Sequence, residues 1–360
     1  MHAITMTNGK GAMAYTGTKP WHDVGNQLTA DATREEWETE AGYKFRLLRS
    51  KVRYAIDKDA QNLLVMPEKH VIFRSDNRQP MSIVSEAFKI VQPADVLDYF
   101  AEVAERTGAK LETAGTLYGG KKFWAMATFG DTDFVIDPND TMKCRLLMAT
   151  ACDGTMATVF KKVSERVVCA NTLGSALNEK GQEVKVRHNS KVDFKAVNEQ
   201  LGITVRDEFE TAMASFRQMA KTKMTNEQMI QATVQLFHPN VQNYTLDEVI
   251  AATKQPAVKR VAEIAVNGIA IGASLAGCQG TAWGWLNACS QYVDHEGGSK
   301  DVSRRLDKAW FGTGEVIKNR AQELAMGQVH NAKAYNTVTT EVDGSALLDA
   351  VLHNTALVTG

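Results

Sequence analysis

Between Tyr43 and Val91, short apolar runs alternate with polar stretches and turn residues, as in Leu63-Leu64-Val65 and Val71-Ile72-Phe73. Side chains of a strand point alternately to its two faces, so this pattern predicts four or five short strands in a meander. The polar residues before it, 1–40, are rich in Thr and Gly and show no regular period. We therefore expect an irregular N-terminal arm.

The next segment begins as a helix and continues as antiparallel strands. Pro93 suits a first helical turn, and apolar residues recur at helical spacing until Gly108. Two turn sequences, Tyr118-Gly119-Gly120 and Asp153-Gly154, are typical of hairpins. The strands expected around them cover residues 110–117, 121–129, 142–151 and 156–160. Arg166 to Cys169 continues extended, and a short helix is expected to begin near Asn171.

From Phe194 the apolar period changes to three or four residues and predicts one long amphipathic helix up to Phe216. Capping-box pairs, Thr225 with Gln228 and Thr245 with Glu248, predict two further helix starts. Helices are also expected over residues 281–295 and 301–326, the latter broken at 312–314. The fold class is α+β, with an antiparallel sheet core in helix–strands–helix order and a mainly helical C-terminal half. The expected segments are the arm (1–40), the α+β core (41–193), two helical segments (194–260 and 261–330) and a weakly structured tail (331–360).

Composition limits the classes of protein to which the chain can belong. It has 360 residues, 41 basic and 42 acidic side chains, and 44% apolar residues. This balance excludes global disorder and a polybasic protein that coats DNA, but it allows a confined basic groove. The N-terminus lacks a secretory pattern, and the apolar run 264–278 is too short to span a bilayer. Five cysteines without tight spacing are typical of reduced thiols, so we expect a cytoplasmic protein and no membrane partner.

Motifs for ordinary catalysis do not occur in the sequence. It contains no CxxC, HxxxH, HExxH or GxSxG, and no phosphate-binding loop. We therefore predict no metal, no cofactor and no catalytic residue, and consider an enzyme the less favoured class. A chemical site formed by Arg166, Cys169, Asn171 and His188 stays open as an alternative.

Positive charge is concentrated on segments that are predicted to be extended. Residues 44–53 contain five bases and no acid. Because residues two apart share a strand face, they predict two basic rows, Lys44/Arg46 and Arg49/Lys51/Arg53, separated by a bend at Leu47-Leu48. Further bases are Lys121, Lys122, Lys161, Lys162, Arg166 and Arg187, and Phe123 and Trp124 are candidates for base stacking.

Basic rows beside aromatic rings suit single-stranded nucleic acid, because the cations follow the phosphates and the rings support the bases. The same pattern also fits a half-buried sheet whose charged residues face water, with Phe123 or Trp124 in the core. Both interpretations remain open at this point.

Five stretches together resemble a known family. They are residues 20–25 (PWHDVG), 115–125 (GTLYGGKKFWA), 166–173 (RVVCANTL), 280–284 with 292–295 (GTAWG and YVDH) and 310–314 (WFGTG). The set is similar to the phage/plasmid-like proteins, a domain family of unknown function found on phages, prophages and conjugative plasmids. The match covers nearly the whole chain and implies mobile-element biology in a bacterial cytoplasm, with no catalytic residue to carry over.

The order of elements between Pro93 and Leu177 also resembles the core of ring-forming single-strand annealing proteins. That resemblance implies a basic groove on a curved sheet and side-by-side assembly.

The leading hypothesis is a homo-oligomeric protein that binds single-stranded DNA and aids recombination or annealing of phage or plasmid DNA without covalent catalysis. Its expected partners are single-stranded DNA, further copies in a ring or filament, and phage or host recombination proteins. The alternative is a protein-binding module that counters host defence or regulates establishment of the mobile element. An exposed apolar stripe on helices between residues 194 and 255 would favour that alternative.

Overall fold

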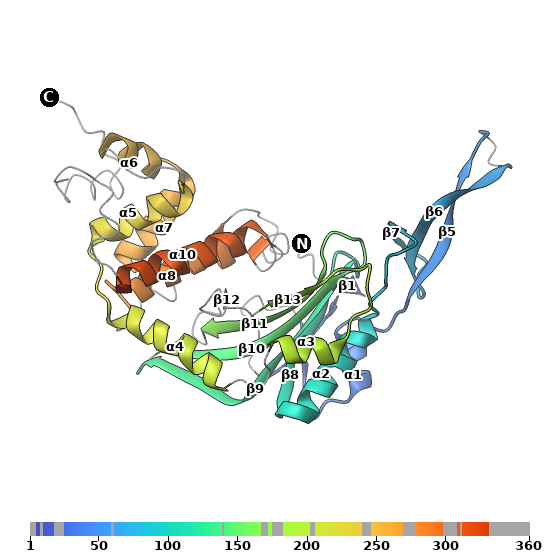
Figure 1. Cartoon of the computed structure of the whole chain (residues 1–360), viewed down its shortest axis with the longest axis horizontal. Coiled ribbons are helices and arrows are strands. Elements are labelled where there is room, and N and C mark those ends of the chain that lie inside the picture. Colours follow the sequence, from blue (N-terminus) through green and yellow to red (C-terminus); the bar gives the residue numbers. More distant parts are fainter. Residues whose placement is uncertain are drawn as a thin grey trace. The chain divides into compact units, whose positions relative to one another are not determined.

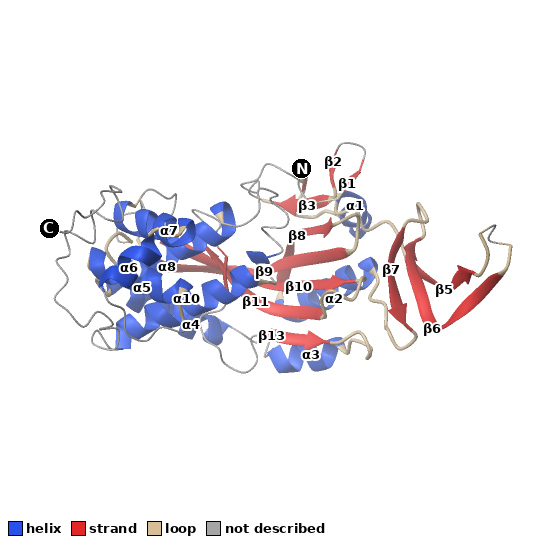
Figure 2. Cartoon of the chain, turned by 90° about the horizontal axis from the view of Figure 1, so that it is seen from above, coloured by secondary structure: helices blue, strands red, loops and turns tan. Residues whose placement is uncertain are grey.

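The computed structural model has the expected α+β class, with most strands in the first half and most helices in the second (Figures 1 and 2). It describes residues 5–7, 10–17, 25–58, 61–138, 140–166, 172–174, 183–201, 206–239, 246–268, 278–297, 308–309 and 312–330. The chain divides into two compact units. The first unit comprises residues 1–132, 144–162 and 178–205, and the second comprises 133–143, 163–177 and 206–360.

The larger sheet contains eight strands among the described residues, in the order β12-β11-β10-β9-β8-β3-β4, and β13 also pairs with β11. The strands are β3 (Met13–Thr16), β4 (Asn26–Leu28), β8 (Ala109–Leu117), β9 (Lys122–Asp137), β10 (Asp140–Ala151), β11 (Thr158–Arg166), β12 (Thr172–Gly174) and β13 (Glu183–Val186). The predicted turns at 118–120 and 153–154 connect β8 to β9 and β10 to β11. Gly119, Gly120 and Gly154 in these turns have a positive φ, which glycine adopts readily. The described residues near Asn171 form strand β12 in place of the expected helix.

The first 40 residues are more regular than expected. They include β1 (Met6–Thr7), β2 (Lys10–Gly11), β3, β4 and helix α1 (Arg34–Glu40). Strand β3 pairs with β8, so this segment completes the main sheet. Thr33 and Glu36 form a reciprocal capping box at the start of α1. The Thr-x-x-Glu spacing was readable in the sequence and identifies this helix start.

The meander predicted between residues 43 and 91 consists of three strands, not four or five. They are β5 (Leu47–Ala55), β6 (Leu63–Arg74) and β7 (Pro80–Ser85), which form a separate antiparallel sheet. Fewer strands are needed because β5 and β6 are long, at 9 and 12 residues.

Tyr99 joins the helices of the first unit to the sheet. It lies on α2 (Pro93–Thr107), which ends as expected at Gly108, and its ring is fully buried. The ring centroid lies 4.9 Å from that of Phe160 on β11 and 5.1 Å from that of Phe194 on α3 (Phe194–Leu201). Its hydroxyl donates to Asn198 Oδ1 at 3.0 Å. One side chain thus connects α2, β11 and α3, and its polar atom is paired as burial requires.

The structure describes two helices, α3 and α4 (Arg206–Lys221), in the region of the long helix predicted from Phe194 to Phe216. Helix α3 ends at Leu201, and α4 begins five residues later. Gly202 follows directly, and three β-branched residues come next. Residues 202–205 lie outside the described part of the structure.

The second unit contains most of the helices. They are α4, α5 (Asn226–Phe237), α6 (Leu246–Thr253), α7 (Pro256–Asn267), α8 (Ala282–Gln291), the π-helix η1 (Tyr292–Glu296) and α10 (Thr313–His330). Thr225 and Gln228 form the predicted capping box, while Thr245 lies outside the described residues. Within the described part of the chain, no helix is long and apolar enough to cross a membrane.

Helix α8 forms the centre of the second unit because its two tryptophans are fully buried. Trp283 Nε1 donates to Asp140 Oδ2 at 2.6 Å, and Trp285 Nε1 donates to Thr233 Oγ1 at 3.0 Å. A buried ion pair, Lys318 Nζ to Asp294 Oδ1 at 2.8 Å, links α10 to the π-helix. The buried polar groups of Trp283, Trp285 and Lys318 therefore each have a specific partner.

The hydroxyl of Tyr43 provides a test of the packing in the first unit. Tyr43 is buried and donates to the carbonyl oxygen of Trp124 at 2.5 Å. We predict that Tyr43→Phe lowers the free energy of unfolding by about 1 kcal/mol, because the buried carbonyl loses a donor. Urea denaturation followed by circular dichroism measures this. The control, Tyr54→Phe on an exposed ring, should leave stability unchanged; equal stability of wild type and Tyr43→Phe would contradict the prediction.

Alkaline pH should destabilise the fold. Burial raises the pKa of the Cys152 thiol to about 12, and burial also raises the pKa values of Cys289, Tyr43 and Tyr99. Above the ordinary pKa of a thiol, the unfolded chain releases a proton that the folded chain keeps. Stability is thus full below about pH 8.5 and falls as pH rises, by up to about 1.4 kcal/mol per pH unit for each group.

Urea unfolding at pH 8, 9 and 10 tests this expectation. The slope of stability against pH should be smaller in Cys152→Ser, because a serine hydroxyl does not titrate in this range. A free energy of unfolding that stays constant from pH 8 to 10 would show that these groups are not buried as described.

Candidate nucleic-acid interface on the β5–β6 hairpin

The β5–β6 hairpin has two parts that differ in their neighbours. Lys51 pairs with His70, but Arg53 pairs with Val65, so β6 contains extra residues between these pairs. Among them, Pro67 has no N–H to donate and Glu68 has a positive φ of 56°. Strand β7 pairs only with residues 69–73 of β6. The distal hairpin, residues 53–58 and 61–66, is therefore a two-stranded ribbon that continues beyond β7 (Figure 2).

The base of the hairpin is held by specific polar contacts. Leu47 N donates to Gln92 Oε1 at 2.8 Å, and Gln92 Nε2 donates to Leu47 O at 3.0 Å. Arg74 donates to Gly119 O at 2.8 Å, and its guanidinium lies 3.9 Å from the ring centroid of Phe45. Gly120 packs below both groups, where a Cβ would lie 2.9 Å from each. These contacts fix the first residues of β5 and the last residue of β6.

A basic row runs outward from this base. Arg49, Lys51 and Arg53 occupy alternate positions of β5, and all three are exposed. Alternate residues share one face of a strand, so the row predicted for these three residues lies on one face. Arg49 Nη2 also donates to Glu86 O at 3.1 Å, which orients the first guanidinium. The bend expected at Leu47-Leu48 is absent; the irregularity lies between Lys51 and Arg53, where β6 has its extra residues.

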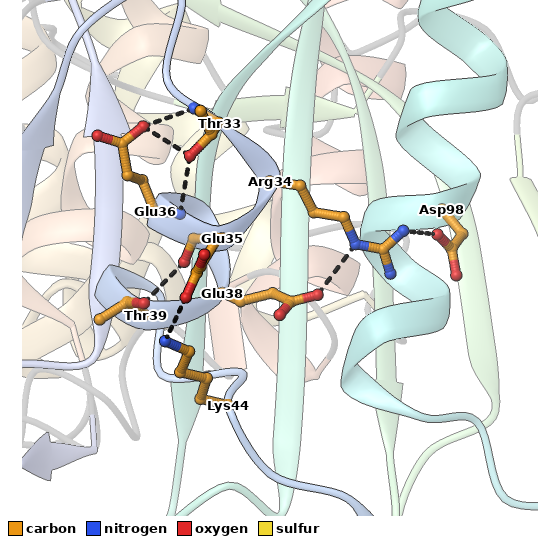
Figure 3. Close-up of polar contacts among 8 residues, drawn as sticks. All are labelled: Thr33, Arg34, Glu35, Glu36, Glu38, Thr39, Lys44 and Asp98. Carbon is orange, nitrogen blue, oxygen red and sulfur yellow. Dashed lines mark hydrogen bonds and ion pairs between the residues drawn. The ribbon is translucent and has the colours of Figure 1, made fainter.

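Lys44 and Arg46 do not form a strand row, because they precede β5 in chain without regular structure. Lys44 Nζ lies 3.1 Å from Glu35 Oε1 of α1 (Figure 3). On the same helix, Arg34 is paired with Glu38 and with Asp98 of α2. Lys44 is thus paired with one exposed acid, Glu35, and Arg46 is also exposed, at the foot of the hairpin.

Four predicted site residues lie in the core and not on a surface. Phe123 and Trp124 are 1% and 5% exposed, and Lys161 and Lys162 are 9% and 2% exposed. Neither ring offers a face to a base, and neither ammonium group is open to a phosphate in this structure. Neighbouring residues of a strand point to opposite faces, and both members of each pair are buried, so both faces of β9 and β11 are covered at these positions. The interpretation with these rings in the core therefore applies.

The remaining predicted bases are scattered. Lys121 is half-buried in the turn before β9, and Lys122 Nζ lies 5.6 Å from the ring centroid of Tyr118. Arg187 is exposed just after β13. Arg166 ends β11, and its side chain lies outside the described part of the structure. Lys121, Lys122 and Arg187 do not lie on β5 and do not extend its basic row.

His188 of the alternative chemical site packs against neighbouring residues of the fold. Its ring stacks on Phe88 with centroids 4.4 Å apart. Its two nitrogens lie 3.1 Å from the carbonyl oxygens of Lys89 and Met156. Cys169 and Asn171 fall outside the described residues. Within the described ranges, no group of three or more His, Cys, Asp or Glu side chains could hold a metal ion.

Sequence reasoning missed the exposed apolar residues of the hairpin. Tyr54 and Ile56 of the first strand segment are 49% and 62% exposed. Leu63, Leu64, Val65 and Met66 of β6 are between 42% and 49% exposed. The signal was two short apolar runs, residues 54–56 and 63–66, on either side of one polar turn. Consecutive residues of a strand point to opposite faces, so such runs place apolar side chains on both faces of the ribbon. The interface therefore combines a basic row with apolar side chains on one ribbon.

Comparison with known proteins gives one match, to a protein-family model. No curated protein and no solved structure matches the chain significantly. One family model does match, over residues 80–310, and its description is "Domain of unknown function (DUF932)". The matched region includes β7, the helices α2 to α8 and the strands between them. Because this match covers more than half of the sequence, the chain belongs to the DUF932 family.

Proposed function

We propose that this protein binds single-stranded DNA as a homo-oligomeric recombination or annealing protein of a phage or plasmid, in the cytoplasm of a bacterial host. The observation that supports the proposal is the exposed row Arg49, Lys51 and Arg53 on a hairpin that extends past its sheet. Phage or host recombination proteins are its proposed further partners.

The row suits a flexible phosphate backbone. Alternate residues of a strand lie about 7 Å apart, so the three cations cover about 14 Å and contact a few nucleotides. A guanidinium binds a phosphate with two parallel hydrogen bonds and also stacks on a base, whereas the ammonium of Lys51 acts as a point charge. Phe123 and Trp124 are buried, so in this proposal the guanidinium groups of Arg49 and Arg53 stack on the bases.

The near-zero net charge shapes the proposed mechanism. With 41 basic and 42 acidic side chains, the protein attracts DNA locally and not over its whole surface. A strand held by its phosphates leaves its base edges free to pair with a complementary strand. Annealing of this kind forms no covalent bond, and it therefore requires neither a metal nor a nucleophile.

Charge reversal on the row tests the proposal. We predict that Arg49→Glu with Arg53→Glu weakens binding to a labelled single-stranded oligonucleotide by about 10-fold or more at low salt. The loss of two phosphate contacts should also reduce the steepness of log K against log salt by about 1.4, since each contact contributes about 0.7. Fluorescence anisotropy at several salt concentrations measures both quantities.

The matched control is Arg106→Glu with Lys195→Glu, which changes net charge equally on exposed positions of α2 and α3. It should retain most of the affinity and the full salt dependence. Wild-type protein without salt-dependent affinity, or equal losses in the two variants, would refute binding at the hairpin row. A protein-binding module would then be the better hypothesis, although the described residues of the 194–255 helices expose no large apolar side chain.

A further inference from the structure

Exposed large apolar side chains are concentrated on the β5–β6–β7 sheet. Of the ten among the described residues, seven lie on this sheet or its distal turn: Tyr54, Ile56, Leu63, Leu64, Val65, Met66 and Ile83. Apolar patches of this kind on a soluble protein mark interaction sites. A two-stranded ribbon with both faces in water is also only marginally stable. This hairpin therefore has the features of a surface that a partner covers.

Strand register sorts these side chains onto two faces. Tyr54 pairs with Leu64, and Val71 pairs with both Ser50 and Ile83, which places these residues on the face opposite to the basic row. We define the apolar face as Leu48, Val52, Tyr54, Leu64, Val71, Phe73 and Ile83. On β5 this face contains no charged residue, whereas the other face has a cation at positions 49, 51 and 53.

We propose that the apolar face docks against the same face of a second copy of this chain. This inference deepens the proposed function and rests on its homo-oligomeric state. It names the surface through which two copies meet.

Two physical arguments favour a second copy as the occupant. In a twofold pair the same apolar face of both copies forms the interface, so each face covers the exposed apolar side chains of the other. Tyr54, Leu64 and Ile83 are 49%, 47% and 60% exposed, and the four other members are half-buried. Together they offer on the order of 500 Å² per copy, so pairing removes on the order of 1,000 Å² from water, which is the minimum for a specific interface.

The distribution of charge favours pairing through the apolar faces over pairing through the basic faces. If the basic faces met, Arg49, Lys51 and Arg53 of two copies would oppose one another, and like charges close together are destabilising. Each apolar face carries one exposed cation, Lys69, against three on the basic face, so pairing through the apolar faces reduces this repulsion. It also leaves both basic rows on the outside, where DNA reaches them.

Disruption of the apolar face should break the assembly. We predict that Tyr54→Ser with Leu64→Ser lowers the weight-average mass measured by sedimentation equilibrium, with a rise of at least about 10-fold in the dissociation constant of the pair. Both side chains are half-exposed in one copy, so the variant should fold, and its circular dichroism and thermal midpoint verify this.

The control is Leu63→Ser with Val65→Ser, on the same β6 segment but on the opposite face. These side chains are 49% and 42% exposed, so the two variants remove similar apolar surface. The control should keep the wild-type mass. A monomeric wild type, an unchanged mass in Tyr54→Ser with Leu64→Ser, or equal dissociation in both variants would overturn the inference.

Oligonucleotide affinity separates this inference from the proposed function. If the wild type binds no DNA but Tyr54→Ser with Leu64→Ser still lowers the mass, the interface is supported and the DNA-binding role is refuted. Unchanged mass in a protein that binds DNA with the expected salt dependence would refute the interface alone.

Discussion

The Gln92 side chain joins the start of the hairpin to helix α2. Its amide pairs with both the N–H and the C=O of Leu47, as a neighbouring strand would, where β5 begins. Its own backbone N donates to Asp95 Oδ2 at 2.8 Å in the first turn of α2. One residue therefore joins the start of the helix to the start of the hairpin. Each of these hydrogen bonds contributes about 1 kcal/mol. Together they orient the first residue of β5, the strand that carries the basic row.

Alternation along β5 is the second constraint. It places Arg49, Lys51 and Arg53 on one face, and Leu48, Val52 and Tyr54 on the other. A nearly neutral protein can thus present a charged surface and an apolar surface within nine residues. The same ribbon can contact a polyanion and a protein at once, because the two contacts use different faces.

Local patterns explain what the sequence predicts correctly. Helix α2 and the turns at 118–120 and 153–154 follow from glycine, proline and spacing, and the β5 row follows from alternation. The burial of Phe123 and Lys162 could not be predicted, because it depends on elements distant in sequence that cover both faces of a strand. The capping box at Thr33 was a local signal that the apolar pattern obscured.

The interruption of β6 at Pro67 and Glu68 also determines how the hairpin tolerates changes of length. Because faces alternate with a period of two, insertion of a single residue into β5 before Arg49 would exchange the charged face for the apolar one, while insertion of two would restore it. The ladder cannot slide past a proline that lacks a donor, so the register is locked at that point. Between the base and this proline, homologous hairpins should therefore differ in length by even numbers of residues. In the turn at the tip they can differ by any number.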